Sequence, residues 1–430
     1  MKSKIILVLI LSIAFVFRLV LAPKIFNGDL LSQADWGEYV AYRGPMNLYS
    51  QNVWVFYWPN HPPLTNIYYG FCFDVFKELS LRLHQSVLLF KKIHIYSRPY
   101  FDFVSSFDLR VSPGVPFSLG YMLSLKLFPI LADIVFGLVI FILAINNKQN
   151  AYKYVLAYLF LPFSWYLSSL WGQTDQLAFL FVFIAFLLVL KYPFWSIILF
   201  FVGGSLKPTS IFLVPLYLFI LYKSKPKYLF VFWGILFCLI LNYFIFTSFT
   251  DEGFPKFTFE RLLPRLFDKP SRLTTNSFNF WHMFVLQRNV ASNTVVFIFS
   301  GKVWSLILLS ILNIFAFLKF KMLNFKSIAF ALFTVSFGSW FFATEMLDRY
   351  AFAGIVSGLA LTIYYPKLFK YWILISFIFW INLFRGWWYP GQLHLLQNLL
   401  EWNNYSIGFL LSLTNFLVYI RMVWLVAREN

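Results

Sequence analysis

The sequence predicts an all-α polytopic membrane protein, and three observations lead to that prediction. The chain has 430 residues, and 60% of them are hydrophobic. Only 12% are charged, about half of the roughly 25% typical of a soluble domain. Apolar runs close to the roughly 20 residues that a helix needs to cross a bilayer recur along the whole chain. The composition excludes a soluble multidomain protein and a disordered chain, and Cys72 and Cys238 are too few for a disulfide framework.

The first apolar run extends from Ile5 to Ala22 and follows Lys2 and Lys4. Arg18 interrupts its end, and no small-residue cleavage site follows cleanly. These features favour an uncleaved first helix with its N-terminus inside over a signal peptide.

Eleven further runs bring the predicted total to about twelve spans, with fewer if the short pair around Pro208 is one broken helix. These runs are Tyr121–Ile145, Tyr154–Leu170, Gln176–Leu190, Pro193–Leu206, Pro208–Tyr222, Tyr228–Phe249, Val303–Leu318, Ser327–Ala343, Tyr350–Tyr365, Tyr371–Phe384 and Ile407–Val426. We expect a single membrane domain over 1–430, with its C-terminal helices in 350–430.

Charge orients the predicted spans. From an inside N-terminus, the inner loops and termini hold fourteen Lys or Arg and one acid, Glu429, as the positive-inside rule requires. Two long polar segments, 23–120 and 250–302, therefore belong outside, and Leu64–Leu83 is typical of an amphipathic interfacial helix. The net charge of +18 is thus mainly an orientation signal and does not indicate nucleic-acid binding.

Polar groups at span ends or within spans are costly in a bilayer, so they mark either a function or a structural pair. Four of five such groups belong to outer loops or outer span ends, and this convergence favours a site on the outer face. The five groups are Gly28–Trp36, Pro59–Thr65, Lys126 with Asp133, Trp171–Asp175 followed later by Lys207, and Thr344–Tyr350.

Each group also has a structural interpretation. Lys126 and Asp133, seven residues apart on one helix face, are a candidate structural ion pair. Asp175 is a suitable N-cap for the helix that follows it. Arg349 can extend to lipid headgroups, and His61 is more typical of a satisfied structural histidine than of a ligand.

Two of the motifs resemble a known family. Gly28-Asp29-x-x-x-Gln33-x-x-Trp36, followed by Pro62-Pro63-Leu64-Thr65, is similar to the first luminal loop of endoplasmic-reticulum glucosyltransferases. Those enzymes extend lipid-linked oligosaccharide from dolichyl-phosphate glucose and belong to the GT-C superfamily of membrane glycosyltransferases.

Further motifs resemble related prokaryotic GT-C proteins in the same order along the chain. They are Leu125–Asp133, Trp171-Gly172-Gln173-x-Asp175, Lys207 and Asn279-Phe280-Trp281. One departure concerns Met346-Leu347-Asp348-Arg349-Tyr350, where Leu347 replaces a histidine that many relatives use toward donor phosphate. The departure shifts that expected contact to Arg349 and Lys207.

The resemblance implies a GT-C-like bundle and an inverting transfer of a hexose from dolichyl or undecaprenyl phosphate to a lipid-linked glycan or another outer-face acceptor. Asp29 is the expected general base, with Asp35 in reserve. Arg349, Lys207 and Lys126 are the expected phosphate contacts, since cations stabilise a leaving phosphate. The expected substrate-binding residues are Gln33, Trp36, His61, Gln173, Asp175, Asn279, Trp281 and Asp348.

The expected partners are the lipid-linked donor, a glycan or glycolipid acceptor and membrane lipid, with the chain as a monomer. No glycine-rich phosphate loop and no metal-ligand spacing occurs, so no cofactor is expected; a carboxylate-bound divalent ion is the alternative. The membrane is the cell membrane in a prokaryote or the endoplasmic reticulum in a eukaryote. The competing functions are a lipid-sugar flippase or transporter, and a polysaccharide polymerase or ligase with a lipid-diphosphate donor.

Overall fold

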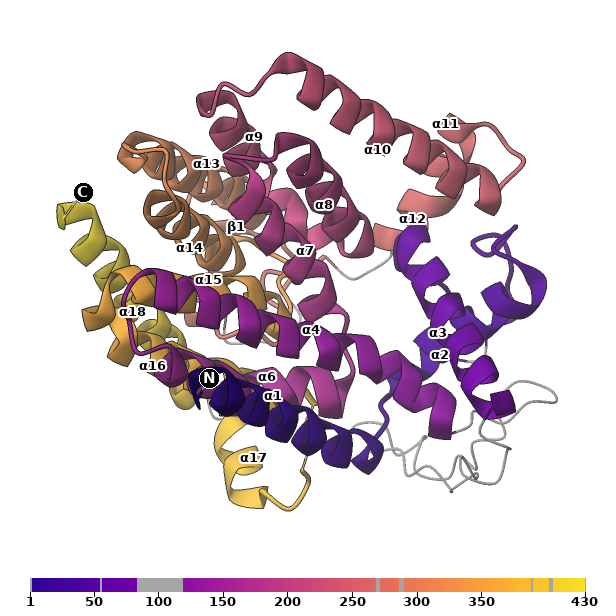
Figure 1. Ribbon diagram of the computed structural model, residues 1–430, viewed down its shortest axis with the longest axis horizontal. Coiled ribbons are helices and arrows are strands. Elements are labelled where there is room, and N and C mark those ends of the chain that lie inside the picture. Colours follow the sequence, from indigo (N-terminus) through magenta and orange to yellow (C-terminus); the bar gives the residue numbers. More distant parts are fainter. Residues whose placement is uncertain are drawn as a thin grey trace.

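The chain folds almost entirely into helices (Figure 1). The computed structural model describes residues 2–54, 56–82, 119–267, 271–285, 290–387, 390–401 and 405–429. Within these ranges, seven helices are long and apolar enough to cross a membrane, so the architecture is that of an all-α polytopic membrane protein. These helices are α1 (Lys2–Leu21), α4 (Leu119–Asn146), α10 (Tyr228–Phe249), α13 (Gly301–Lys319), α14 (Phe325–Phe342), α16 (Phe369–Trp387) and α18 (Tyr405–Glu429).

Shorter apolar helices fill the space between the long ones. The predicted span Tyr154–Leu170 is wrong as one continuous helix, because Leu161 is extended at ψ 141° before Pro162, which has no N–H to continue the helix. At Lys207, φ −147° similarly separates α8 from the helical turn that follows it. The shorter elements are α5 (Ala151–Phe160), α6 (Pro162–Trp165), the π-helix η2 (Tyr166–Trp171), α7 (Asp175–Leu188), α8 (Pro193–Leu206), η3 (Pro208–Leu213), α9 (Val214–Lys223) and α15 (Phe352–Tyr364).

The two predicted outer segments also contain helices. The predicted interfacial helix Leu64–Leu83 corresponds to α3 (Pro63–Arg82), while 83–118 lies outside the described residues. Strands β1 (Val295–Val296) and β2 (Phe299–Ser300) form one antiparallel pair in the second segment. The remaining elements are η1 (Ala22–Lys24), α2 (Gly28–Arg43), α11 (Phe254–Lys256), η4 (Phe257–Leu262), α12 (Leu263–Phe267), η5 (Phe280–Met283), η6 (Asp348–Ala351), η7 (Pro366–Leu368) and α17 (His394–Leu400).

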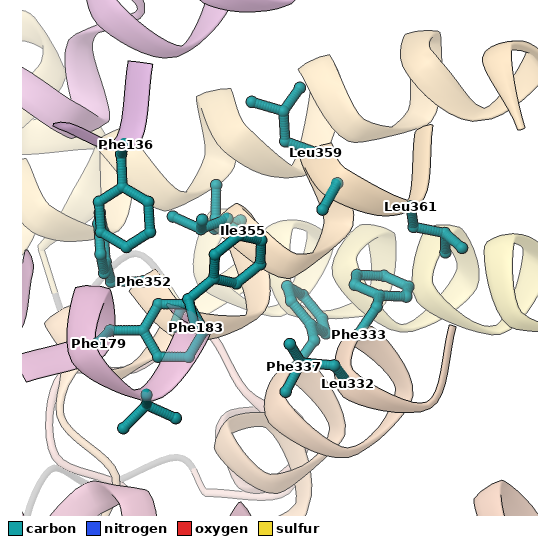
Figure 2. Packing of buried hydrophobic residues seen from close by; sticks show 14 of the residues in the cluster. Phe136, Phe179, Phe183, Leu332, Phe333, Phe337, Phe352, Ile355, Leu359 and Leu361 are labelled. Carbon is teal, nitrogen blue, oxygen red and sulfur yellow. The ribbon is translucent and has the colours of Figure 1, made fainter. Parts of the chain in front are cut away.

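The centre of the bundle is an apolar core shared by α4, α7, α14 and α15. Every residue of α14 from Ser327 to Phe342 is buried. Figure 2 shows phenylalanines from these helices packed against aliphatic side chains of α14 and α15. Ring pairs such as Phe136 with Phe183, 5.8 Å apart, contribute about 0.5–1.5 kcal/mol each beyond their buried area.

One ion pair is fully buried between α1 and α4. Arg18 Nε lies 3.2 Å from Asp133 Oδ2, and neither side chain is exposed. Arg18 also donates to the carbonyl of Leu159 at 2.9 Å, near the C-terminal end of α5. The predicted pairing of Asp133 with Lys126 is therefore wrong, because Asp133 faces α1 and its partner is Arg18.

Candidate functional site

The first component of the site is the start of α2. The side chain of Asn27 caps this helix by accepting a hydrogen bond from Leu30 N at 2.8 Å. Its amide nitrogen donates to the carbonyl of Trp171 at 3.2 Å, which joins α2 to the loop before α7. Asp29 is the second residue of α2, where the helix dipole favours a carboxylate, and its side chain is 48% exposed.

Two other segments contact Asp29. Arg349 Nη1 lies 3.4 Å from Asp29 Oδ2, and Gln173 Nε2 donates to the same oxygen at 3.2 Å. The structure therefore brings together a carboxylate, a guanidinium and an amide that are far apart in the sequence. The carboxylate is accessible, whereas the Arg349 side chain is only 12% exposed.

The guanidinium of Arg349 lies near two aromatic rings and near carboxylates that favour its charged form. Its guanidinium carbon is 5.4 Å from the ring centre of Trp171 and 5.8 Å from that of Tyr350. Burial lowers the pKa of Arg349, but the carboxylates of Asp29 and two further aspartates outweigh burial and raise that pKa above its ordinary value. Its Nε is buried without a hydrogen-bond partner among the described residues, so one donor remains for an anion.

A second ion pair adjoins Tyr350. Lys207 Nζ contacts Asp175 Oδ2, and both side chains are buried. The N-cap position of α7 is occupied by Thr174, and Asp175 is the first residue of the helix, so the predicted N-cap role of Asp175 is wrong. Its carboxylate forms the ion pair with Lys207 instead. The lysine nitrogen lies 5.7 Å from the ring centre of Tyr350, the ring that Arg349 also approaches. The two ion pairs are therefore neighbours.

A small cavity of about 40 Å³ lies beside the second pair. Asp175, Lys207 and Tyr350 line it together with Ser339, whose buried hydroxyl has no partner in the described part of the chain. At roughly 10–15 Å³ for each water molecule, the cavity has room for a few waters.

Asp348 positions the backbone of Arg349. Its carboxylate accepts a hydrogen bond from Arg349 N at 2.8 Å and is buried. Gly386 of α16 leaves the room for it, because a Cβ at that position would lie 1.7 Å from Asp348 Oδ2. Asp348 is thus placed to hold the backbone of Arg349 rather than to meet a ligand directly.

Lys126 is fully buried and packs against Gly172, the neighbour of Gln173. Its Nζ donates to the carbonyls of Ala22, Ile25 and Leu170 at 2.6–2.9 Å. Gly172, at φ +75°, packs over it, since a Cβ there would lie 2.9 Å from Lys126 Cγ. The geometry gives Lys126 the role of joining α4 to the segments that carry Asp29 and Gln173, and all three of its hydrogen bonds go to backbone.

Trp36 and His61, two of the expected substrate-binding residues, lie in an aromatic and acidic region next to the site. Trp36 Nε1 donates to the carbonyl of Tyr57, and its ring lies edge-on to His61 at 5.4 Å. His61 Nδ1 is 2.7 Å from the hydroxyl of Tyr69. Burial raises the pKa of Tyr69 well above its usual value, and Asp29 and Asp175 raise it further. Tyr69 is therefore near the site, although the sequence drew no attention to it.

Further along α2, Gln33 and Asp35 are buried. The side-chain amide oxygen of Gln33 has no hydrogen-bond partner among the described residues. Burial, followed by the neighbouring Asp35 carboxylate, raises the pKa of Glu38 to about 7. Glu38 was not predicted, although its spacing of three residues from Asp35 on a helix indicates the proximity.

Asn279 and Trp281 make contacts within the fold. Trp281 Nε1 donates to the carbonyl of Phe342 at 2.9 Å, and the ring is buried. Asn279 Oδ1 accepts from His282 N at 3.3 Å, which caps η5. Among the described residues, neither side chain forms a hydrogen bond with Asp29 or Arg349.

Within the described ranges, no group of three or more His, Cys, Asp or Glu side chains is arranged to hold a metal ion. The sequence matches no family model, and no curated protein matches it.

Proposed function

We propose that this protein is an inverting glycosyltransferase that moves a hexose from a polyprenyl-phosphate sugar to a hydroxyl of a lipid-linked glycan or another outer-face acceptor. The observation that supports the proposal most strongly is the meeting of Asp29, Gln173 and Arg349, with the Lys207–Asp175 pair next to them. An accessible carboxylate beside two partly or fully buried cations suits proton abstraction next to phosphate departure.

In the proposed reaction, Asp29 accepts the proton of the acceptor hydroxyl. The hydroxyl oxygen bonds to the anomeric carbon as the bond from that carbon to the phosphate oxygen breaks, and the phosphate leaves with the electron pair. Arg349 and Lys207 stabilise the charge that develops on the phosphate oxygens. The guanidinium fork of Arg349 suits two of those oxygens.

Donor binding in this proposal loosens the resting ion pair. The 3.4 Å separation of Asp29 and Arg349 is long for a charge-assisted hydrogen bond. A donor phosphate competes for Arg349, and the freed Asp29 carboxylate is then available to the acceptor hydroxyl. The lipid tail stays in the membrane, against the apolar surface of the bundle.

The proposal includes a finer topology. About twelve spans with a GT-C-like arrangement place both long segments, and hence the site, on the outer or luminal face. The chain acts as a monomer without a bound cofactor in this proposal.

The test is transfer by membranes that carry the full chain and are supplied with a panel of labelled polyprenyl-phosphate sugars. Mass spectrometry of the lipid products identifies the sugar that is transferred. Asp29→Asn is expected to reduce transfer by about 10²–10⁴-fold, the range for a general base. Asp251→Asn, an equivalent change at an exposed outer-segment carboxylate, is the matched control and retains transfer.

Arg349→Lys extends the test, because it keeps the charge and removes the fork. The variant is expected to raise the KM for the donor while its expression stays at the wild-type level. Undiminished transfer by Asp29→Asn contradicts the base assignment, and absence of transfer from every donor in the panel by the wild-type chain contradicts the proposed function.

A further inference from the structure

A second pocket lies between the starts of α8 and α10, and it shares no lining residue with the cavity beside the Lys207–Asp175 pair. Figure 1 shows these two helices side by side. The pocket has a volume of about 380 Å³, within the range of roughly 300–1,000 Å³ typical of ligand sites. Five of its seven lining residues are aromatic, and Pro193 also lines it. Side chains that line it are Lys191, Tyr192, Phe194, Trp195, Phe230 and Trp233.

The pocket opens to the surroundings of the protein. Trp195 is 58% exposed and Trp233 is 51% exposed. Only 17% of the apolar stretch of α10 is buried within the protein, so most of this helix faces the bilayer. Exposed apolar surface on this scale in a membrane helix is suited to acyl chains. Trp and Tyr rings are the side chains enriched where acyl chains meet headgroups.

The mouth of the pocket carries positive charge. Lys191 lines it directly, and Lys227 is the residue immediately before α10. Lys223 ends α9, Lys225 lies in the loop between α9 and α10, and all four lysines are exposed. No carboxylate forms an ion pair with any of the four in the described part of the chain.

From the aromatic pocket and the unpaired lysines at its mouth, we infer that this is a binding site for a phospholipid with an anionic headgroup. The lysines attract the headgroup phosphate, and the aromatic walls hold the upper part of an acyl chain. The predicted orientation places the site in the inner leaflet, where anionic lipids and positive loops meet. The inference is independent of the proposed transferase function.

Native mass spectrometry of the full-length protein, titrated with phosphatidylglycerol or with phosphatidylcholine of identical acyl chains, tests it. The wild type is expected to retain phosphatidylglycerol in preference to phosphatidylcholine. Lys191→Gln/Lys227→Gln is expected to weaken phosphatidylglycerol binding by about fivefold for each lysine. Lys367→Gln/Lys370→Gln, with the same loss of charge at exposed lysines elsewhere, is the control and should retain the preference.

Trp233→Ala separates the pocket from general charge attraction, because it is expected to weaken retention of both lipids. Equal retention of the two lipids by the wild type overturns the inference. So does an equal loss in the Lys367→Gln/Lys370→Gln control, or a co-purifying protein in place of lipid at the pocket.

Discussion

Replacement of Arg18 by methionine tests a charged side chain that is fully buried in the described part of the bundle. Both members of the Arg18–Asp133 pair have no exposed side-chain area, so neither has water to replace a lost partner. After Arg18→Met, Asp133 keeps the hydroxyl of Tyr158, which donates to it at 2.6 Å, but loses its countercharge. Removing one partner of a buried pair costs about 3–5 kcal/mol of unfolding free energy.

The contacts of Arg18 predict an asymmetry between the two single replacements. After Asp133→Leu, the guanidinium still donates to the Ala14 carbonyl, the Leu159 carbonyl and the Ser164 hydroxyl at 2.9–3.2 Å. We therefore expect Asp133→Leu near the lower end, at about 3 kcal/mol, and Arg18→Met near the upper end, at about 5 kcal/mol.

The double variant Arg18→Met/Asp133→Leu leaves no uncompensated charge. Its remaining cost is the loss of one hydrogen bond each at the Leu159 carbonyl, the Ser164 hydroxyl and the Tyr158 hydroxyl, at about 1 kcal/mol each. We expect a total of about 3 kcal/mol, well below the sum of about 8 kcal/mol for the single variants.

The assay is unfolding of the purified protein by sodium dodecyl sulfate in mixed micelles, followed by tryptophan fluorescence. Arg421→Met, at an exposed arginine of α18, is the matched control and should change the unfolding free energy by less than about 0.5 kcal/mol. A cost below about 1 kcal/mol for Arg18→Met, or additive costs in the double variant, would refute this account of the pair.

Three further predictions concern the surroundings of the proposed site. Gly386→Ala forces Asp348 out of place, so it should lower stability by about 1–3 kcal/mol in the same unfolding assay, whereas Gly204→Ala, with open space to 3.9 Å, should not. The pKa of Glu38 is raised to about 7 from 4.5, so its contribution to stability is present at pH 4.5 and is lost as pH rises to 7; Glu38→Gln should flatten that part of the unfolding–pH curve, and an unchanged curve would count against the shift. Lys126→Met leaves three carbonyls without their donor and should destabilise the fold by about 1–3 kcal/mol; a stable variant that only fails to bind donor would instead support a phosphate contact.

The helices themselves were largely readable from the sequence. The predicted runs Pro193–Leu206 and Tyr228–Phe249 coincide with α8 and α10. The bounds of such helices can be predicted because they depend only on local composition, namely an apolar run that begins or ends at a Pro or Lys. The break at Leu161 was missed, although Pro162 marks it, because hydropathy averages over a window and is insensitive to one absent N–H. The count of twelve spans and their orientation stay predictions.

The candidate site was predictable as a set of residues but not as a set of contacts. Asp29, Gln173 and Arg349 were each selected by their polarity at a predicted span end, and the structure brings them together. The same reasoning added Lys126 and the family resemblance added Asn279, whereas Asn279 caps η5 and Lys126 bonds to backbone carbonyls. Polarity identifies a residue that needs a partner, and it does not identify the partner.

The sequence by itself determined that this chain is a helical membrane protein, because solvent preference and helix length depend on composition over short stretches. The tertiary structure alone decided which charge meets which. Arg18 pairs with Asp133 across 115 residues of sequence, even though Lys126 lies on the same helix as that carboxylate. The pairing depends on which helix faces pack together, and side-chain fit over the whole bundle sets that packing.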